Sequence, residues 1–328
     1  MWSKTASILI AIFFFESLLL IVSINLNEKF VSEPSMNEDY FLYGNAKLGF
    51  GNFRIPPILI GTMFYQGQTL VDRKDERQFD VSKAKKRIDA QKSLANQYKL
   101  SDLVEISAVT PEAMVKYLDF YFEYYDPPFV LGGSFDAKIA GIEYLNENGI
   151  KSDDYIYNSI SNLKNKKEIE LLKKNKITSV VVLILGSNHM SSTQKYSYIT
   201  GKNQPGNVSI IDGLKQIGID KIWIDGGVID IESFSHILDT QQIVSKSLKL
   251  PVGTAPTLFL FKYSSPRLNQ KFHTKYRKAS VMFIASWYSN FIFYGAIEDA
   301  KECFASVYQA IELKNVMKKN NIRLFDNL

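Results

Sequence analysis

The chain has few of the residues that build disulfides or metal centres. Its 328 residues include one cysteine, Cys303, and three histidines. A single thiol cannot form an internal disulfide, and Cys-rich or His-rich metal sites need more of these ligands than the chain holds. The sequence therefore predicts no metal centre, and it predicts that Cys303 is a small buried hydrophobe.

A clustered excess of basic charge is also missing. The net charge is +5, but basic residues are interspersed with acidic ones, and no basic patch is interleaved with aromatic residues. Nucleic-acid-binding proteins usually gather their basic residues on one face, so we predict no nucleic-acid partner. With 46% hydrophobic and 22% charged residues, the chain has enough apolar material for a folded core.

Only one long hydrophobic run is present, at residues 6–24, and Glu16 interrupts it. A membrane-spanning helix needs about 20 apolar residues, so the run is long enough for an anchor or an uncleaved signal segment. No small-residue cleavage site follows, which argues against a removed signal peptide. The alternative is that translation begins at Met36. Residues 1–35 are therefore an N-terminal hydrophobic segment that is either a membrane anchor or an artefact of start-site choice.

From Ile58 onward, short apolar segments alternate with amphipathic ones, which predicts β-strands followed by helices. The predicted strands are 58–65, 103–109, 129–135, 155–159, 179–185, 221–229, 251–256 and 290–294. Between them we predict helices, a polar loop at 186–207 and a basic loop at 263–278. Eight such units match the roughly 250 residues of a (β/α)8 TIM barrel. We predict one α/β barrel domain over 58–320, after an irregular lead-in at 36–57 and the N-terminal hydrophobic helix.

Polar residues and glycines stand at the ends of the predicted strands. They are Glu105, Gly132, Gly133, Asn158, Ser159, Ser187, Asn188, Asp225, Thr254 and Tyr294. Each alone is better explained as a structural residue of the barrel rim, satisfied by backbone groups. In closed parallel barrels, however, the reactive groups lie at the carboxyl ends of the strands, so together these residues predict a site at one mouth.

The side chains in this set suit a flat, nitrogen-rich ring. A carboxylate such as Asp225 or Glu105 can accept two parallel N–H bonds from an amino-pyrimidine edge. An amide such as Asn158 or Asn188 can both donate and accept hydrogen bonds. Gly226 lacks a side chain, which leaves room for a ring or permits a tight turn.

Seven segments, taken in order, resemble a known family. They are ILIGTMFYQG from Ile58, VTPEAMVKYLDF from Val109, IAGIEYLNENGI from Ile139, YIYNSIS from Tyr155, WIDGGVIDI from Trp223, LPVGTAP from Leu250 and FYGAIEDA from Phe293. In order and spacing they are similar to the H-subunit family of tetrahydromethanopterin S-methyltransferase. The resemblance runs from about Tyr43 to Ile311.

The resemblance implies a TIM-barrel methyltransferase. Such a barrel takes the methyl group from N5 of a methyl-tetrahydropterin, either tetrahydromethanopterin or tetrahydrofolate, and passes it to the cobalt of a corrinoid (cobalamin) on a partner protein. It implies Asn158 and Asp225 as catalytic residues, and Glu105, Asn158, Asn188, Asp225 and Gly226 as pterin-binding residues. It also implies a homodimer. N5 is a poor leaving group, so it must be protonated or hydrogen-bonded as the methyl leaves.

The chain departs from the family pattern at several of these positions. Glu105 stands where the family usually has Asp, and Gly132 lies in the block where a further Asp is absent. Asn188 is a substitute for the usual asparagine after the fifth strand, and Thr254 interrupts the block of the seventh. These changes keep open a non-catalytic paralogue that serves as a binding or scaffold protein of a complex. A pterin-using synthase is a third interpretation, for which Lys271–Lys278 is the candidate phosphate-binding loop.

The location follows from the same resemblance. The family member works on the cytoplasmic face of a membrane complex. We therefore expect the barrel on the cytoplasmic face of the membrane, associated through residues 6–24, or free in the cytoplasm if translation starts at Met36.

Overall fold

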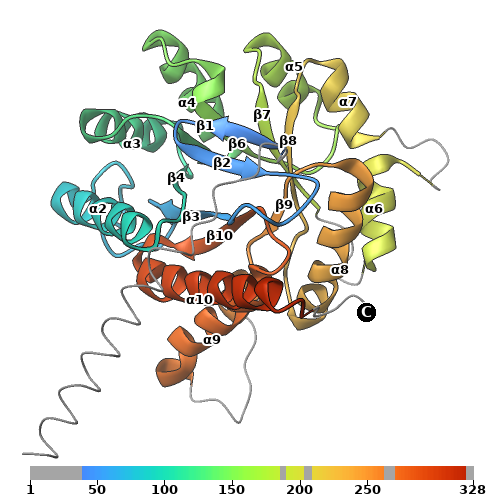
Figure 1. Cartoon of the computed structure of the whole chain (residues 1–328). Helices are drawn as coiled ribbons and strands as arrows, with labels where there is room; N and C mark the ends of the chain where they lie inside the picture. Colours follow the sequence, from blue (N-terminus) through green and yellow to red (C-terminus); the bar gives the residue numbers. More distant parts are fainter. Residues whose placement is uncertain (1–38, 185–189, 203–208, 262–269, 323–328) are drawn as a thin grey trace, which may run out of the picture. The chain divides into compact units, whose positions relative to one another are not determined.

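The computed structural model describes residues 39–184, 190–202, 209–261 and 270–322 (Figure 1). The chain divides into two compact units, of which Asp39–Lys314 is one, while Met1–Glu38 and Asn315–Leu328 make up the other. The predicted N-terminal hydrophobic segment lies outside the described residues. Among the helices that are described, none has both the length and the apolar character needed to cross a membrane.

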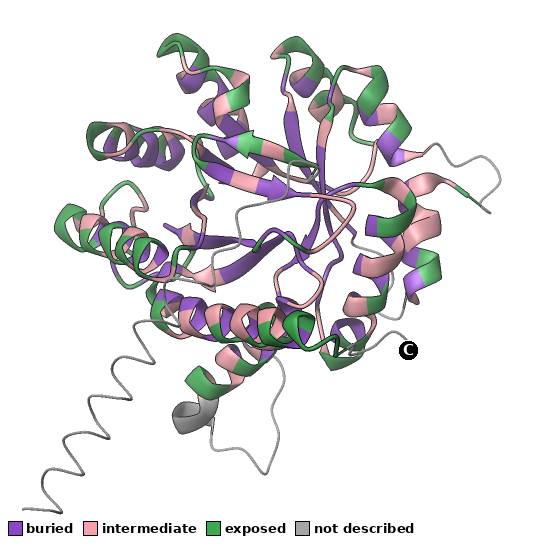
Figure 2. Cartoon of the chain, in the orientation of Figure 1, coloured by how far each residue is buried: buried purple, intermediate pink, exposed green. Residues whose placement is uncertain are grey.

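Eight parallel strands of the described chain close into a barrel, in the order β10-β3-β4-β5-β6-β7-β8-β9. They are β3 (Ile58–Met63), β4 (Asp102–Ala108), β5 (Phe129–Gly133), β6 (Tyr155–Ile160), β7 (Ser179–Leu183), β8 (Lys221–Asp225), β9 (Val252–Thr254) and β10 (Phe291–Ala296). Helices surround this ring of strands, and the strands themselves are almost entirely buried (Figure 2). The predicted TIM barrel is confirmed.

The helices of the barrel begin close to the strand ends. They are α2 (Val81–Tyr98), α3 (Pro111–Tyr124), α4 (Phe135–Glu147), α5 (Lys166–Lys174), α6 (Ser192–Thr200), α7 (Ile210–Gln216), α8 (Ile231–Leu248), α9 (Gln270–Ala285) and α10 (Ala300–Lys319), with 3-10 turns η1 (Ser152–Asp154), η2 (Leu258–Phe261) and η3 (Ile297–Asp299). Asp80, Thr110 and Ser134 cap α2, α3 and α4 by accepting a hydrogen bond from a backbone N–H three residues on. Such caps satisfy N–H groups of the first helical turn, and here they also fix the loops that follow the strands.

Three segments differ from the sequence prediction. The lead-in contains an antiparallel hairpin of β1 (Tyr40–Tyr43) and β2 (Ala46–Gly49). The predicted polar loop at 186–207 contains α6, which starts at a capping box formed by Ser191 and Gln194. Helix α9 begins at Gln270, inside the predicted basic loop. The first residues of α6 and α9 are polar or basic. The periodic spacing of apolar residues that predicts the other helices is therefore weak in both segments.

The hairpin closes the amino-terminal end of the barrel. Alternate strand residues such as Ile58, Ile60 and Trp223 form the apolar interior, and Tyr43 of the hairpin belongs to the same cluster. Trp223 Nε1 donates a hydrogen bond to the Tyr43 hydroxyl over 2.9 Å, and this hydroxyl also pairs with Ser179 Oγ at 3.0 Å. Because Ser179 is the first residue of β7, the hairpin lies at the strand starts. A site inside the barrel would therefore open at the opposite end.

Candidate active site

Glu105 links three strands near the carboxyl end of the barrel. It lies on β4 and is only 8% exposed. Thr62 Oγ1 on β3 donates to Glu105 Oε2 over 2.6 Å, and Asn158 Nδ2 on β6 donates to Glu105 Oε1 over 2.6 Å. Asn158 and Thr62 are half-buried, so they lie nearer the solvent than the carboxylate that they contact. The structure thus brings together two of the predicted site residues, Glu105 and Asn158, and adds Thr62.

Gly132 provides the space that Glu105 occupies. It lies on β5, between the strands that carry Glu105 and Asn158. A Cβ atom at Gly132 would stand 2.4 Å from Glu105 Oε1, a distance that carbon and oxygen cannot reach without displacement. The glycine therefore lets the longer carboxylate cross in front of β5 to Asn158.

Asp225 lies at the end of β8, in a turn that a buried lysine holds. Its side chain is 5% exposed, and its Oδ1 accepts a hydrogen bond from the Gly227 backbone N–H at 2.9 Å. Lys195 of α6 donates from Nζ to the carbonyls of Gly226 at 2.8 Å and Gly227 at 3.2 Å. A Cβ at Gly226 would meet the terminal methyl group of Ile237 of α8 at 2.1 Å, so the glycine lets this side chain pack against the turn. Its predicted contact with a ligand stays a prediction.

Burial disfavours the charge of both carboxyl groups. It raises the pKa of Glu105, against the hydrogen bonds from Thr62 and Asn158. Burial also raises the pKa of Asp225 to about 7, and the charge of Glu105 acts in the same direction. A carboxyl group with a pKa near 7 can hold or release a proton at neutral pH, which is the property required of a general acid or base.

Two buried lysines lie beside these carboxyl groups, and sequence reasoning missed both. The charge of Lys195 lowers the pKa of Asp225, and that of Lys138 lowers the pKa of Glu105. Burial in turn lowers the pKa of each ammonium group. Lys138 could have been found, because it lies on the buried side of α4 with Ala137 and Gly141. The sequence did not indicate that Lys195 is buried beside Asp225, because its segment was predicted to be a loop.

Lys138 joins a polar cluster behind β6. Its Nζ donates to the Ser159 carbonyl at 3.2 Å, lies 3.7 Å from Glu168 and stands 4.0 Å from the centre of the Tyr157 ring. The Tyr157 hydroxyl donates to Glu168 Oε1 at 2.6 Å. This cluster supports the end of β6, where Asn158 is located.

Other predicted residues lie elsewhere. Tyr294 faces the helices, because its hydroxyl bonds to Gln91 of α2. Thr254 also faces outward, because strand residues alternate and the next residue, Ala255, packs against the barrel interior. These two positions were wrongly placed at the mouth. Asn188 and its neighbour Ser187 lie outside the described residues. Lys271–Lys278 belongs to α9, so the expected phosphate-binding loop was also wrong.

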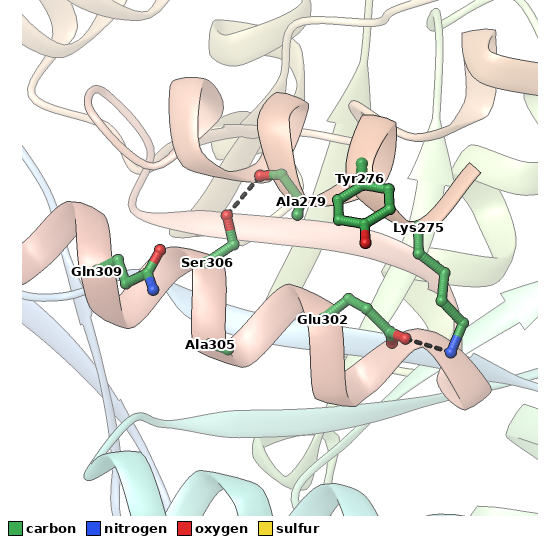
Figure 3. A pocket seen from close by; sticks show the side chains of 7 residues that line it. All are labelled: Lys275, Tyr276, Ala279, Glu302, Ala305, Ser306 and Gln309. Carbon is green, nitrogen blue, oxygen red and sulfur yellow. Dashed lines mark hydrogen bonds and ion pairs between the residues drawn. The ribbon is translucent and has the colours of Figure 1, made fainter. Parts of the chain in front are cut away.

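A hollow on the outside of the barrel lies between α9 and α10 (Figure 3). Its lining consists of Lys275, Tyr276, Ala279, Glu302, Ala305, Ser306 and Gln309. Lys275 pairs with Glu302 at 2.5 Å, and Ser306 Oγ donates to the Ala279 carbonyl. None of the mouth residues lines this hollow, so the two features are separate. Among the described residues, no group of three or more potential ligands is arranged to hold a metal ion.

Residues 40–324 match the family model of the tetrahydromethanopterin S-methyltransferase MtrH subunit. The H subunit of this enzyme from Methanothermobacter marburgensis is 28% identical over 273 residues, which cover 81% of this chain and 87% of that protein. The H subunit of a putative mtx methyltransferase from Methanosarcina barkeri is 34% identical over 149 residues, which cover 45% of this chain and 47% of that protein.

Structural comparison finds similar barrels. Dihydropteroate synthase from Yersinia pestis, solved with a pterine-sulfa conjugate, has a TM-score of 0.57 and 12% identity, covering 84% of this chain and 99% of that one. The same enzyme from Clostridium difficile, solved in the presence of pteroic acid, has a TM-score of 0.58 and 11% identity, with the same coverage. At this identity the likeness establishes the fold alone.

Proposed function

Because this chain belongs to the tetrahydromethanopterin S-methyltransferase MtrH subunit family, we propose that it transfers a methyl group from N5 of a methyl-tetrahydropterin to the cobalt of a corrinoid on a partner protein. The observation that carries the proposal is the mouth cluster, in which the half-buried Asn158 bonds to the buried Glu105 and the charge of Glu105 acts on the buried Asp225, within a family of methyltransferase subunits. The pterin ligands of the structurally similar synthases support the choice of donor.

In this proposal Asp225 binds the amino-pyrimidine edge of the pterin. Its Oδ1 is held by the Gly227 N–H, which orients the carboxylate, and the Lys195 ammonium stabilises the ionised form. An ionised carboxylate accepts N–H bonds strongly in a buried site. Asn158 lies close to the reacting end of the ring, and Asn188 is a further proposed contact.

In the proposed reaction, no side chain of the protein has to form a covalent bond with the substrate. A reduced corrinoid on the partner would supply the nucleophile that accepts the methyl group, and N5 would gain a proton as the methyl group leaves. The protein has to orient the pterin, exclude water and keep N5 hydrogen-bonded or protonated. With a pKa of about 7, Asp225 is partly ionised at neutral pH, and its ionised form can accept N–H bonds from the amino-pyrimidine edge.

The non-catalytic alternative rests on the carboxylate that is absent from the block around Gly132. Glu105 weakens that argument, because its Oε1 lies 2.4 Å from the position of a Cβ at 132. A carboxylate therefore occupies the space in front of β5, although β4 supplies it.

The relatives are named as subunits, which supports a protein partner. That this partner carries the corrinoid is part of our proposal. A homodimer, tetrahydrofolate in place of tetrahydromethanopterin, and attachment to the cytoplasmic face of a membrane through residues 6–24 are further parts of the proposal.

The test is a methyl-transfer assay with the full chain. The protein is mixed with methyl-tetrahydromethanopterin or methyl-tetrahydrofolate and reduced cobalamin, and the cobalt absorbance is followed. We expect protein-dependent methyl-cobalt formation with one of the two donors. If neither donor reacts or binds, the methyltransferase proposal falls and the scaffold alternative replaces it.

A further inference from the structure

We infer that Glu105 is a positioning residue, which holds the amide of Asn158 so that the Asn158 carbonyl oxygen, and not its NH2 group, meets the pterin. The inference rests on the proposed function and deepens it, because it assigns the hydrogen-bonding direction of one contact. The sequence predicted that Glu105 binds the ring directly. The inference gives it a different role.

The side chains of Glu105 and Asn158 lie at different depths in the mouth. Glu105 is 8% exposed, whereas Asn158 is half-buried, so a ligand that enters the mouth meets Asn158 first. Both carboxylate oxygens of Glu105 already accept a hydrogen bond, one from Thr62 and one from Asn158. Glu105 is therefore placed to hold its neighbours.

The hydrogen bond to Glu105 fixes the direction of the Asn158 amide. Thr62 donates to one oxygen of Glu105 and Asn158 Nδ2 donates to the other over 2.6 Å, so both oxygens act as acceptors and the NH2 group is the part of the amide that faces Glu105. The carbonyl oxygen is the other substituent of Cγ in the same plane, so it is turned away from Glu105. Within the described part of the chain, no hydrogen bond to Asn158 Oδ1 is found.

Gly132 and Lys138 keep the Glu105–Asn158 pair in place. Gly132 leaves the space through which Glu105 reaches Asn158. Lys138 donates to the Ser159 carbonyl at 3.2 Å, which holds the backbone next to Asn158, and its charge favours the ionised form of Glu105. The orientation of the amide is thus supported from β4, β5 and α4.

The consequence concerns specificity. Asp225 and Asn158 would both act as acceptors, so the bound ring must present N–H groups to both of them. A ring that offers an unprotonated nitrogen at the Asn158 position would place two lone pairs together and would bind weakly, so N5 has to carry a proton where it meets the Asn158 carbonyl.

The experiment reverses the polarity of the Glu105–Asn158 pair. Asn158→Asp places two carboxylates in contact, so at pH 8 we expect pterin affinity to fall by about 100-fold. In the double variant Glu105→Gln/Asn158→Asp, the introduced amide donates to the introduced carboxylate, whose outer oxygen still accepts from the ring. We expect this double variant to bind the pterin within about tenfold of the wild type. Glu143→Gln, at an exposed position of α4, is the matched control and should change nothing.

The outcomes separate the inference from the proposed function. If the double variant binds no better than Asn158→Asp, the ring needs the Asn158 NH2 group and the inference is overturned. Melting temperatures of the same proteins test the pair without a ligand, since Asn158→Asp should lower the value and the double variant should restore it. Wild-type protein that binds no pterin overturns the proposed function and the ligand contact together. Absence of the melting-temperature rescue overturns the Glu105–Asn158 pairing itself.

Discussion

The two ends of the barrel use buried polar groups in different ways. At the amino-terminal end, Tyr43, Ser179 and Trp223 form a neutral hydrogen-bonded set within an apolar cluster. At the carboxyl end, Glu105 and Asp225 are buried carboxyl groups whose pKa values burial raises. Neutral hydrogen bonds cost little to bury, whereas buried charges reduce stability unless they are paired. The comparison indicates that the first end maintains the fold, and it agrees with our proposal that the second binds the pterin.

The largest expected effect is on stability at the closed end. Trp223→Ala removes a side chain with no exposed surface and leaves the Tyr43 hydroxyl without its donor. We expect the free energy of unfolding to fall by about 3–5 kcal/mol. Denaturant unfolding measures it, with Trp223→Phe as a milder control. A loss below about 1 kcal/mol would show that this end does not maintain the fold.

At the mouth, Asp225→Asn should act on binding and not on stability. The amide keeps the shape of the carboxyl group but removes the negative charge, so we expect pterin affinity to fall by about 100-fold, or about 2.7 kcal/mol. The free energy of unfolding should stay the same or rise, because a buried charge is removed. Titration calorimetry and denaturant unfolding check the two parts, and an unchanged dissociation constant would remove Asp225 from the binding site.

The fold and the site differed in how far sequence could predict them. The strands were predictable because buried apolar runs such as 179–183 have a clear period and flanking polar residues. Asn158, Glu105 and Asp225 were predictable as polar strand ends. The outward direction of Thr254 and Tyr294 was not, because it depends on strand register. Lys195 could not be predicted, since its contact with Gly226 and Gly227 joins residues that are distant in the sequence.

The raised pKa of Asp225 predicts a pH dependence of stability. Its pKa in the fold is about 7, above the ordinary value of 3.8, so the folded protein binds this proton more tightly than the unfolded chain does. Stability must therefore fall as the pH rises from about 4 to about 7. We expect a loss of roughly 2.6 kcal/mol between pH 5 and pH 8 from this group, since one unit is worth about 1.4 kcal/mol. Unfolding of wild type and Asp225→Asn at both values tests it, and equal slopes would contradict it.

A smaller effect is expected at Lys195. Lys195→Met keeps the apolar part of the side chain but removes the donor to the Gly226 and Gly227 carbonyls and the charge beside Asp225. We expect pterin affinity to fall by about tenfold, or about 1.4 kcal/mol. Lys215→Met on α7, where the lysine is exposed, is the control. Equal affinities for the two variants would show that the turn needs no support from α6.

The most direct test of the account is methyl transfer to reduced cobalamin, measured in parallel with wild type, Asp225→Asn and Trp223→Phe. We predict methyl-cobalt formation with the wild type, a rate reduced by only a few-fold with Trp223→Phe, and no activity above background with Asp225→Asn at the same pterin concentration. Methyl-cobalt formation that is unaffected by Asp225→Asn would contradict the assignment of the reaction to this mouth of the barrel.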